Sequence, residues 1–173
     1  MQLDDVLRSF SSFLERERIR YALIGGLAMN AWGSGRTTQD ADFVVELSNR
    51  ERVIEFAESA GYETIHISDG YSNHVRGSDR VDFMYVDAAT ANQLFTAAEH
   101  RVVVGDISVP VARPEHLAAM KAIAIKWAPR RAYRDISDVL FLLRLPGVDR
   151  EFIREYFTRK GLLEIFDDIE KRI

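Results

Sequence analysis

Apolar residues near the start of the chain recur at helical spacing. Between residues 3 and 19 they are Leu3, Val6, Leu7, Phe10, Phe13, Leu14 and Ile19, with charged residues between them. This spacing predicts an amphipathic helix that packs on a core. The next apolar run, residues 21–24, ends at Gly25-Gly26, and residues 27–32 again suit a helix. We therefore expect a strand, a glycine turn and a short helix.

The remaining pattern predicts an α/β core followed by helices. Further strands are expected at residues 42–47, 64–67, 72–76, 80–86, 102–104 and 107–109, and further helices at 50–60, 88–98, 114–127, 135–144, 150–159 and 161–171. The last two strands suit a hairpin around Gly105-Asp106. The predicted fold class is α/β (α+β), a small mixed sheet flanked by helices. Residues 1–113 form the α/β core, and residues 114–173 form a helical segment packed on it as one compact unit.

Composition narrows the class of protein. The chain has 173 residues, of which 47% are hydrophobic and 29% charged, typical of a globular domain. Its net charge of −4 argues against a general basic field for duplex DNA, and the absence of cysteine excludes disulfides and thiolate metal sites. Residues 1–20 mix charges throughout and lack the apolar segment of a signal peptide. We expect a cytoplasmic protein with no membrane segment.

Positive charge is concentrated in one part of the helical segment. The residues are Lys121, Lys126, Arg130, Arg131 and Arg134. Such a stretch is typical of a surface that holds an RNA end, and it is equally typical of a solvated helix end and loop. The sequence leaves both interpretations open.

Two aspartates begin a strand and share one face of it. Asp40 and Asp42 are two residues apart, so both side chains project to the same side. Ala41, Phe43 and Val45 occupy the opposite side and are apolar, as expected where helices pack. Alone, such a pair is a weak signal, because a turn or strand end also favours aspartate.

A third carboxylate, Asp82, lies within another apolar strand, where an unpaired charge is costly. If the two strands are neighbours, Asp82 joins Asp40 and Asp42. Three carboxylates in one place repel one another unless divalent cations offset them, and oxygen ligands favour Mg²⁺ or Mn²⁺. The alternative is that Asp82 pairs with an arginine such as Arg80.

Gly25-Gly26 adds a second feature beside the carboxylates. Glycine permits close backbone approach, and the following helix N-terminus offers amide N–H groups to a phosphate. A tight strand-to-helix turn would use the same residues without any ligand. The histidines are scattered, so none is assigned to chemistry, and Trp32 and Trp127 are interpreted as core residues rather than base-stacking platforms.

Taken together, residues 25–45 resemble the signature of the polymerase-beta-like nucleotidyltransferase superfamily. Its members pair a glycine-rich turn with Arg-x-Thr/Ser-x-Asp-x-Asp, which Arg36, Thr38, Asp40 and Asp42 match. The resemblance is greatest to the branch of abortive-infection type IV toxins. That branch carries a lysine on one helix and a basic residue followed by Asp-x-x-Asp on the next, and residues 121 and 134–138 are similar.

The resemblance implies site residues and chemistry. Asp40, Asp42 and Asp82 would be catalytic and hold two Mg²⁺ (or Mn²⁺) ions. The residues that would contact the nucleotide are Gly25, Gly26, Ser34, Arg36, Thr38, Lys121 and Asp135. Asp135 would orient Lys121 or contact the nucleotide, or it is a helix cap, with Lys121 merely solvated; Asp138 is interpreted as mainly structural.

The implied activity is transfer of a nucleoside monophosphate from a triphosphate to a hydroxyl group. The acceptor would be an RNA end, a protein or a small molecule, and the resemblance implies a toxin with a cognate antitoxin protein as partner. The alternative is a non-catalytic module or regulatory subunit that keeps the fold. The intact Asp-x-Asp favours the enzyme.

Overall fold

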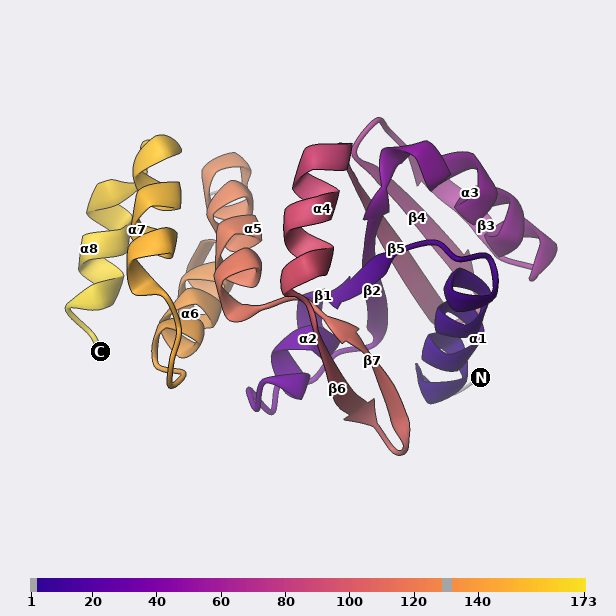
Figure 1. The fold of residues 1–173 in the computed structure, drawn as a ribbon, viewed down its shortest axis with the longest axis horizontal. Coiled ribbons are helices and arrows are strands. Elements are labelled where there is room, and N and C mark those ends of the chain that lie inside the picture. Colours follow the sequence, from indigo (N-terminus) through magenta and orange to yellow (C-terminus); the bar gives the residue numbers. More distant parts are fainter. Residues whose placement is uncertain (1–2, 129–131) are drawn as a thin grey trace. The chain divides into compact units, whose positions relative to one another are not determined.

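The computed structural model describes residues 3–128 and 132–173, and the chain divides into two units, Met1–Ala112 and Arg113–Ile173 (Figure 1). The first unit contains α1 (Leu3–Arg16), β1 (Tyr21–Ile24), α2 (Gly25–Ala31), β2 (Asp40–Glu46), the 3₁₀ turn η1 (Leu47–Asn49), α3 (Arg50–Ser59), β3 (Glu63–Ile67), β4 (Tyr71–Arg76), β5 (Asp79–Val86), α4 (Ala88–Ala97), β6 (Glu99–Val104) and β7 (Ile107–Val111). The second contains α5 (Pro114–Trp127), α6 (Ala132–Leu143), α7 (Arg150–Arg159) and α8 (Leu163–Glu170). The predicted fold class is confirmed. The packing of one unit on the other stays a prediction.

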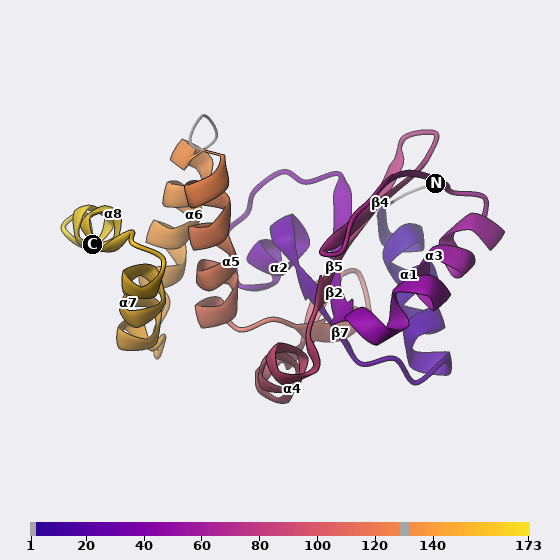
Figure 2. The same ribbon diagram turned by 90° about the horizontal axis from the view of Figure 1, so that it is seen from above.

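The first unit is built on a seven-stranded sheet in the order β3-β4-β5-β2-β1-β7-β6. β2 pairs with β5, and β1 with β7, in parallel, while the other pairs are antiparallel. Helices α1 and α3 cover one face, and α2 and α4 lie on the other (Figure 2). The sheet is mixed, as the sequence predicts.

Aromatic packing fixes which face of the central strands is the core. Phe43 of β2 and Phe83 of β5 are fully buried, and their ring centroids lie 6.4 and 5.8 Å from that of Phe10 in α1. Alternation along each strand then directs Asp42 and Asp82 to the other face. Burying the aromatic rings thus determines where the carboxylates lie.

One boundary differs from the prediction in a way that matters for the site. The helix α2 begins at Gly25, directly after β1, instead of at residue 27 after a glycine turn. Gly25 has φ +65°, so a single residue in the left-handed region redirects the chain from strand to helix. The glycine pair is therefore the first turn of the helix itself.

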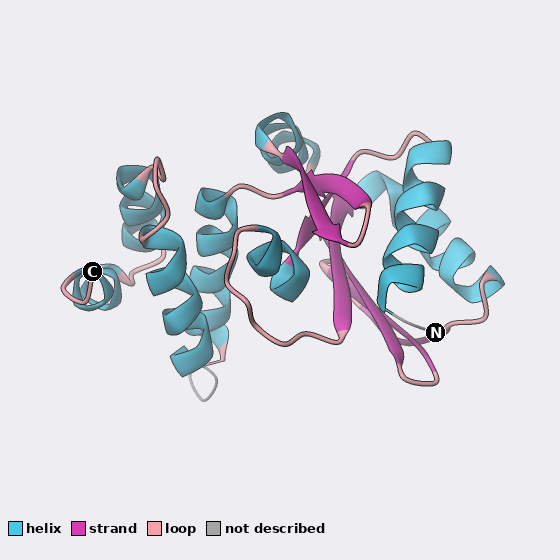
Figure 3. Cartoon of the chain, turned by 90° about the horizontal axis from the view of Figure 1, so that it is seen from below, coloured by secondary structure: helices cyan, strands magenta, loops and turns pink. Residues whose placement is uncertain are grey.

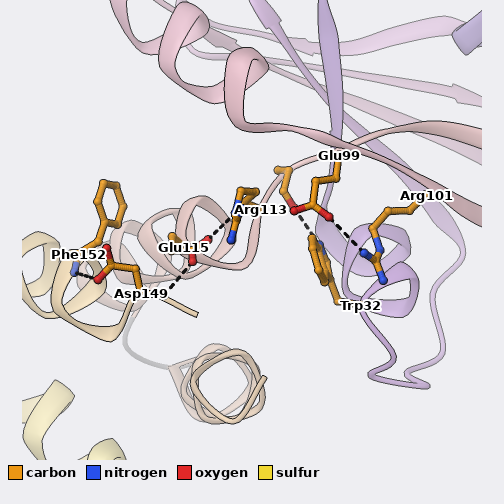
Figure 4. Close-up of polar contacts among 8 residues, drawn as sticks. Trp32, Glu99, Arg101, Arg113, Glu115, Asp149 and Phe152 are labelled. Atoms are coloured by element: carbon orange, nitrogen blue, oxygen red, sulfur yellow. Dashed lines mark hydrogen bonds and ion pairs between the residues drawn. The ribbon is translucent and has the colours of Figure 1, made fainter. Parts of the chain in front are cut away.

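The second unit has its own hydrogen-bonded connection between α5 and α7 (Figure 4). The buried Glu115 accepts from Arg113 Nε at 3.2 Å and from the Asp149 backbone N–H at 2.9 Å. Asp149 in turn caps α7 by accepting from the Phe152 backbone N–H at 3.0 Å. In the described ranges, no helix is long and apolar enough to cross a bilayer.

A buried chain of polar side chains runs under the α1–α3 face of the sheet. His74 Nδ1 lies 3.1 Å from Thr64 Oγ1, and its Nε2 lies 2.8 Å from Ser72 Oγ. Ser72 Oγ also contacts the Tyr85 hydroxyl at 2.6 Å. Burial lowers the pKa of His74, although the charge of Glu58 acts in the opposite direction. The neutral imidazole is therefore the form that the fold stabilises.

We expect this histidine to make the first unit sensitive to acid. Because the folded-state pKa of His74 lies below that of the unfolded chain, about 6.5, the unfolded chain binds the proton first as pH falls. Above pH ~6.5 the contribution of His74 to the free energy of unfolding is therefore fully present. Below that pH the free energy of unfolding decreases, by at most about 1.4 kcal/mol per pH unit for one group. Denaturant unfolding of wild type and His74→Asn across pH 5–8 measures the slope. Equal slopes in wild type and His74→Asn would show that His74 does not cause the pH dependence. The variant should keep a smaller slope from His116, because burial lowers the pKa of that histidine too.

Candidate active site

The two strands that carry the acidic residues are parallel neighbours. Asp42 of β2 is in register with Asp82 of β5, and Asp40 is in register with Arg80. Residues directly opposite each other on neighbouring strands project to the same face, so all three carboxylates share the face opposite Phe43. Each of the three residues is half-buried. The structure therefore brings together the acids that the sequence singled out.

The environment of Asp82 disfavours its charged form. Burial raises the pKa of its carboxyl group, and the negative charge of Asp40 raises it further. Hydrogen bonding from the Asn73 side chain and the charge of Arg80 lower it. The charges of Arg80 and Asp40 thus act on Asp82 in opposite directions, and a direct ion pair between Asp82 and Arg80 stays a prediction. Asn73, the register partner of Asp82 on β4, was not singled out from the sequence.

The glycine pair lies against this acidic face with no room for side chains. A Cβ atom added to Gly25 would lie 1.9 Å from Asp42 Oδ2, and one added to Gly26 would lie 2.5 Å from Thr38 Oγ1. Both distances are far below a van der Waals contact. The backbone at the start of α2 therefore approaches Asp42 and Thr38 as closely as only glycine allows.

A loop joins α2 to β2 and carries the remaining predicted residues of this unit (Figure 3). Asn30 near the end of α2 accepts from the Ser34 hydroxyl at 2.9 Å and from the Arg36 backbone N–H at 2.8 Å. Asn30 Nδ2 also donates to the Arg36 carbonyl at 2.7 Å. Asn30 was not singled out from the sequence, although a polar residue in an otherwise apolar short helix is a usable signal.

Trp32 follows α2 and is held from two sides (Figure 4). Its indole N–H donates to the Ala112 carbonyl at 2.9 Å, and the Arg101 guanidinium lies 3.8 Å from its ring centroid. Arg101 also donates to the Ala31 carbonyl at 3.0 Å and pairs with Glu99 at 3.4 Å. Trp32 is thus a structural anchor for the end of α2, but it is half-buried and not the core residue that the sequence suggested.

In the second unit, one lysine is enclosed by two aspartates. Lys121 Nζ lies 2.8 Å from Asp135 Oδ1 and 2.7 Å from Asp138 Oδ2, with the three side chains 20%, 14% and 13% exposed. The interpretation of Lys121 as merely solvated is therefore wrong. So is that of Asp135 as a helix cap, because α6 begins at Ala132 and Asp135 lies in its first turn. The roles of Lys121 and Asp135 toward a nucleotide stay predictions.

The basic stretch carries two exposed aromatic residues. Trp127 at the end of α5 is 78% exposed, so its interpretation as a core residue is wrong, and Tyr133 at the start of α6 is 66% exposed. Lys126 and Arg134 beside them are exposed as well. Pro129, Arg130 and Arg131 lie outside the described residues.

The donor set fits a hard divalent cation in the type of its ligand atoms. Asp40, Asp42 and Asp82 offer oxygen ligands from one face, and the mutual repulsion of Asp40 and Asp82 is what a cation would relieve. As the side chains stand, however, no three His, Asp or Glu residues among 3–128 and 132–173 form a complete ligand set. The carboxylates would have to turn toward one another to share an ion.

A comparison with known families assigns the chain to one of them. The sequence model described as "Nucleotidyl transferase AbiEii toxin, Type IV TA system" matches residues 6–172. The chain belongs to the AbiEii family. It is a nucleotidyltransferase of the kind found as the toxin in type IV toxin–antitoxin systems. A comparison with the sequences of curated proteins finds no match.

Solved structures place the AbiEii-family chain in the nucleotidyltransferase fold. The solution structure of the antibiotic-resistance factor ANT(2'')-Ia is similar with a TM-score of 0.72 at 15% identity, over 95% of this chain and 97% of that one. The lincosamide antibiotic adenylyltransferase LnuA gives 0.54 at 14% identity, over 83% and 96%. An antigenic nucleotidyltransferase-like protein from Paracoccidioides brasiliensis gives 0.57 at 16% identity, over 96% and 92%. At these identities the likeness concerns the fold alone.

Proposed function

We propose that this nucleotidyltransferase transfers a nucleoside monophosphate from a nucleoside triphosphate to a hydroxyl group at an RNA end, with Mg²⁺ as cofactor. The observation that carries the proposal is the register pairing of Asp42 with Asp82, next to the close approach of Gly25. A polar triad of this kind on the half-exposed face of a sheet is costly to keep unless it serves chemistry.

The reaction is an in-line displacement at the α-phosphorus. The acceptor oxygen forms a new bond to phosphorus, the bond to the β-phosphate oxygen breaks, and pyrophosphate leaves. In the proposal, the acceptor proton passes to the carboxylate of Asp82, which lies in register with Asp42. Mg²⁺ held by Asp40, Asp42 and Asp82 would supply charge stabilisation for the attacking and leaving oxygens.

The triphosphate would lie against the first turn of α2. Two features support this placement, the absence of side chains at Gly25 and Gly26 and the helix N-terminus that follows β1. In the proposal, Arg36 offsets phosphate charge, and Ser34 and Thr38 offer hydroxyl groups.

An RNA acceptor is favoured by the exposed aromatic residues of the second unit. Trp127 and Tyr133 stand at the end of α5 and the start of α6, flanked by Lys126 and Arg134. Exposed rings among basic residues suit single-stranded nucleic acid, because bases stack on the rings while cations neutralise phosphates. As a family toxin, the protein would act on RNA until bound by its antitoxin.

A transfer assay tests the proposal. Purified protein is incubated with each of the four labelled triphosphates and with a pool of small RNAs, in Mg²⁺ and in excess chelator. We expect label in RNA and release of pyrophosphate in Mg²⁺ only, and loss of labelling when the RNA ends are oxidised with periodate. No transfer to any RNA, with or without Mn²⁺, would contradict the proposal.

The aromatic residues provide the control for the acceptor. Trp127→Ala combined with Tyr133→Ala is expected to weaken RNA labelling about 10-fold or more, because each lost stacking contact is worth about 1–3 kcal/mol. The matched variant is Tyr71→Phe, an exposed aromatic in the first unit, which should label RNA as wild type does. Equal labelling by the double variant would reject this surface as the RNA contact.

A further inference from the structure

Asn30, near the C-terminal end of α2, is hydrogen-bonded to the loop that follows the helix. Its Oδ1 accepts from the Ser34 hydroxyl at 2.9 Å and from the Arg36 backbone N–H at 2.8 Å, and its Nδ2 donates to the Arg36 carbonyl at 2.7 Å. The amide thus holds both main-chain polar groups of one residue, as a neighbouring strand would. Such a pair fixes the position of Arg36 relative to α2.

The opposite end of the helix that carries Asn30 is the glycine pair Gly25-Gly26. Asn30 lies in the same short helix as Gly25 and Gly26, whose backbone approaches Asp42 and Thr38. The helix itself is held at its end by Trp32, through the Ala112 carbonyl and the Arg101 guanidinium. Residues 25, 26, 34 and 36 therefore belong to one braced segment, with Asn30 as the link.

We infer that Asn30 is a positioning residue for nucleotide binding, which sets Ser34 and Arg36 at a fixed distance from the phosphate-facing turn of α2. This inference rests on the proposed function. It assigns to Asn30 no contact with the substrate. A purely structural asparagine at a helix end would affect folding stability alone, whereas a positioning residue affects affinity for the triphosphate.

The test compares variants that remove different parts of the hydrogen bonding. Asn30→Ala removes all three bonds, and Asn30→Asp keeps the acceptor oxygen but loses the donor to the Arg36 carbonyl. Thr37→Ala, an exposed residue of the same loop, is the matched control. We expect the KM for the triphosphate to rise about 10- to 100-fold in Asn30→Ala with kcat changed much less, to rise less in Asn30→Asp, and to stay at the wild-type value in Thr37→Ala.

Two readouts that need no catalysis separate this inference from the proposed function. Amide hydrogen exchange at Arg36 should accelerate in Asn30→Ala, because its N–H loses its acceptor, and the dissociation constant for each triphosphate, measured by calorimetry, should rise. If wild type transfers nothing but binds a triphosphate, the proposed reaction fails while these readouts still decide the role of Asn30. Unchanged triphosphate binding, whether or not Arg36 exchange accelerates, would overturn the inference.

Discussion

Replacing Asp42 with asparagine is expected to reduce nucleotidyl transfer by about 1000-fold or more, without unfolding the protein. Asparagine has the same shape but lacks the charge, and Asp42 is the carboxylate that lies both beside Asp82 and against Gly25. Under the proposed function Asp42 would hold Mg²⁺, and removal of such a ligand should cost more than the 10- to 100-fold typical of its supporting neighbours. Initial rates in Mg²⁺ measure the effect, together with the melting temperature. In cells, growth arrest caused by the wild type should be relieved.

Glu46→Gln is the matched control for this variant. Glu46 is a carboxylate on the same strand and the same face, at the far end of β2, where it faces Arg20 at 4.0 Å. A partly exposed pair at that distance contributes little, so activity should stay within about twofold of wild type. Retention of a tenth or more of the activity in Asp42→Asn would show that Asp42 does not belong to the reacting centre.

The second large effect is expected from Gly25→Ala. The new Cβ atom would lie 1.9 Å from Asp42 Oδ2, so either the carboxylate or the first turn of α2 has to move. The φ of +65° adds about 1–2 kcal/mol of strain for any L-residue. We expect transfer to fall about 100-fold or more, since a displacement of about 1 Å at a reacting group has costs of this order. Activity is compared with the unfolding free energy of the same variant.

Gly77→Ala separates the strain from the displacement. Gly77 lies between β4 and β5 with a φ of +59°, and a Cβ atom there meets nothing within 4 Å. Both variants should lose similar stability from the backbone, while only Gly25→Ala should lose activity. Wild-type rates in Gly25→Ala would show that transfer does not depend on the position of the Asp42 carboxylate, contrary to this prediction.

Local pattern was sufficient to predict much of this fold. The alternation of Ala41, Phe43 and Val45 with Asp40 and Asp42 predicts which face of β2 is buried, because side chains on a strand alternate with a period of two. Helical spacing likewise predicts α1, whose Phe10 packs on that face. These predictions depend on residues close together in the sequence.

Contacts between residues far apart in the sequence could not be predicted from local pattern. The parallel register that sets Asp42 opposite Asp82 could only be stated as a condition, since nothing local encodes which strands become neighbours. The enclosure of Lys121 by Asp138 as well as Asp135 depends on the rotation of two helices about their axes. The sequence showed the residue types of the site and left their pairing to the tertiary structure.

The order of strands in the sheet has a consequence for protein synthesis. Asp42 lies on β2, but its neighbour Asp82 arrives on β5, only after β3 and β4 have left the ribosome, and β1 gains its partner β7 later still. Pairings between such distant segments form slowly, because loop closure precedes the favourable contacts. A nascent chain that has emerged only as far as β4 carries two of the acids without the third. The complete set of three acids therefore exists only once β5 has paired with β2.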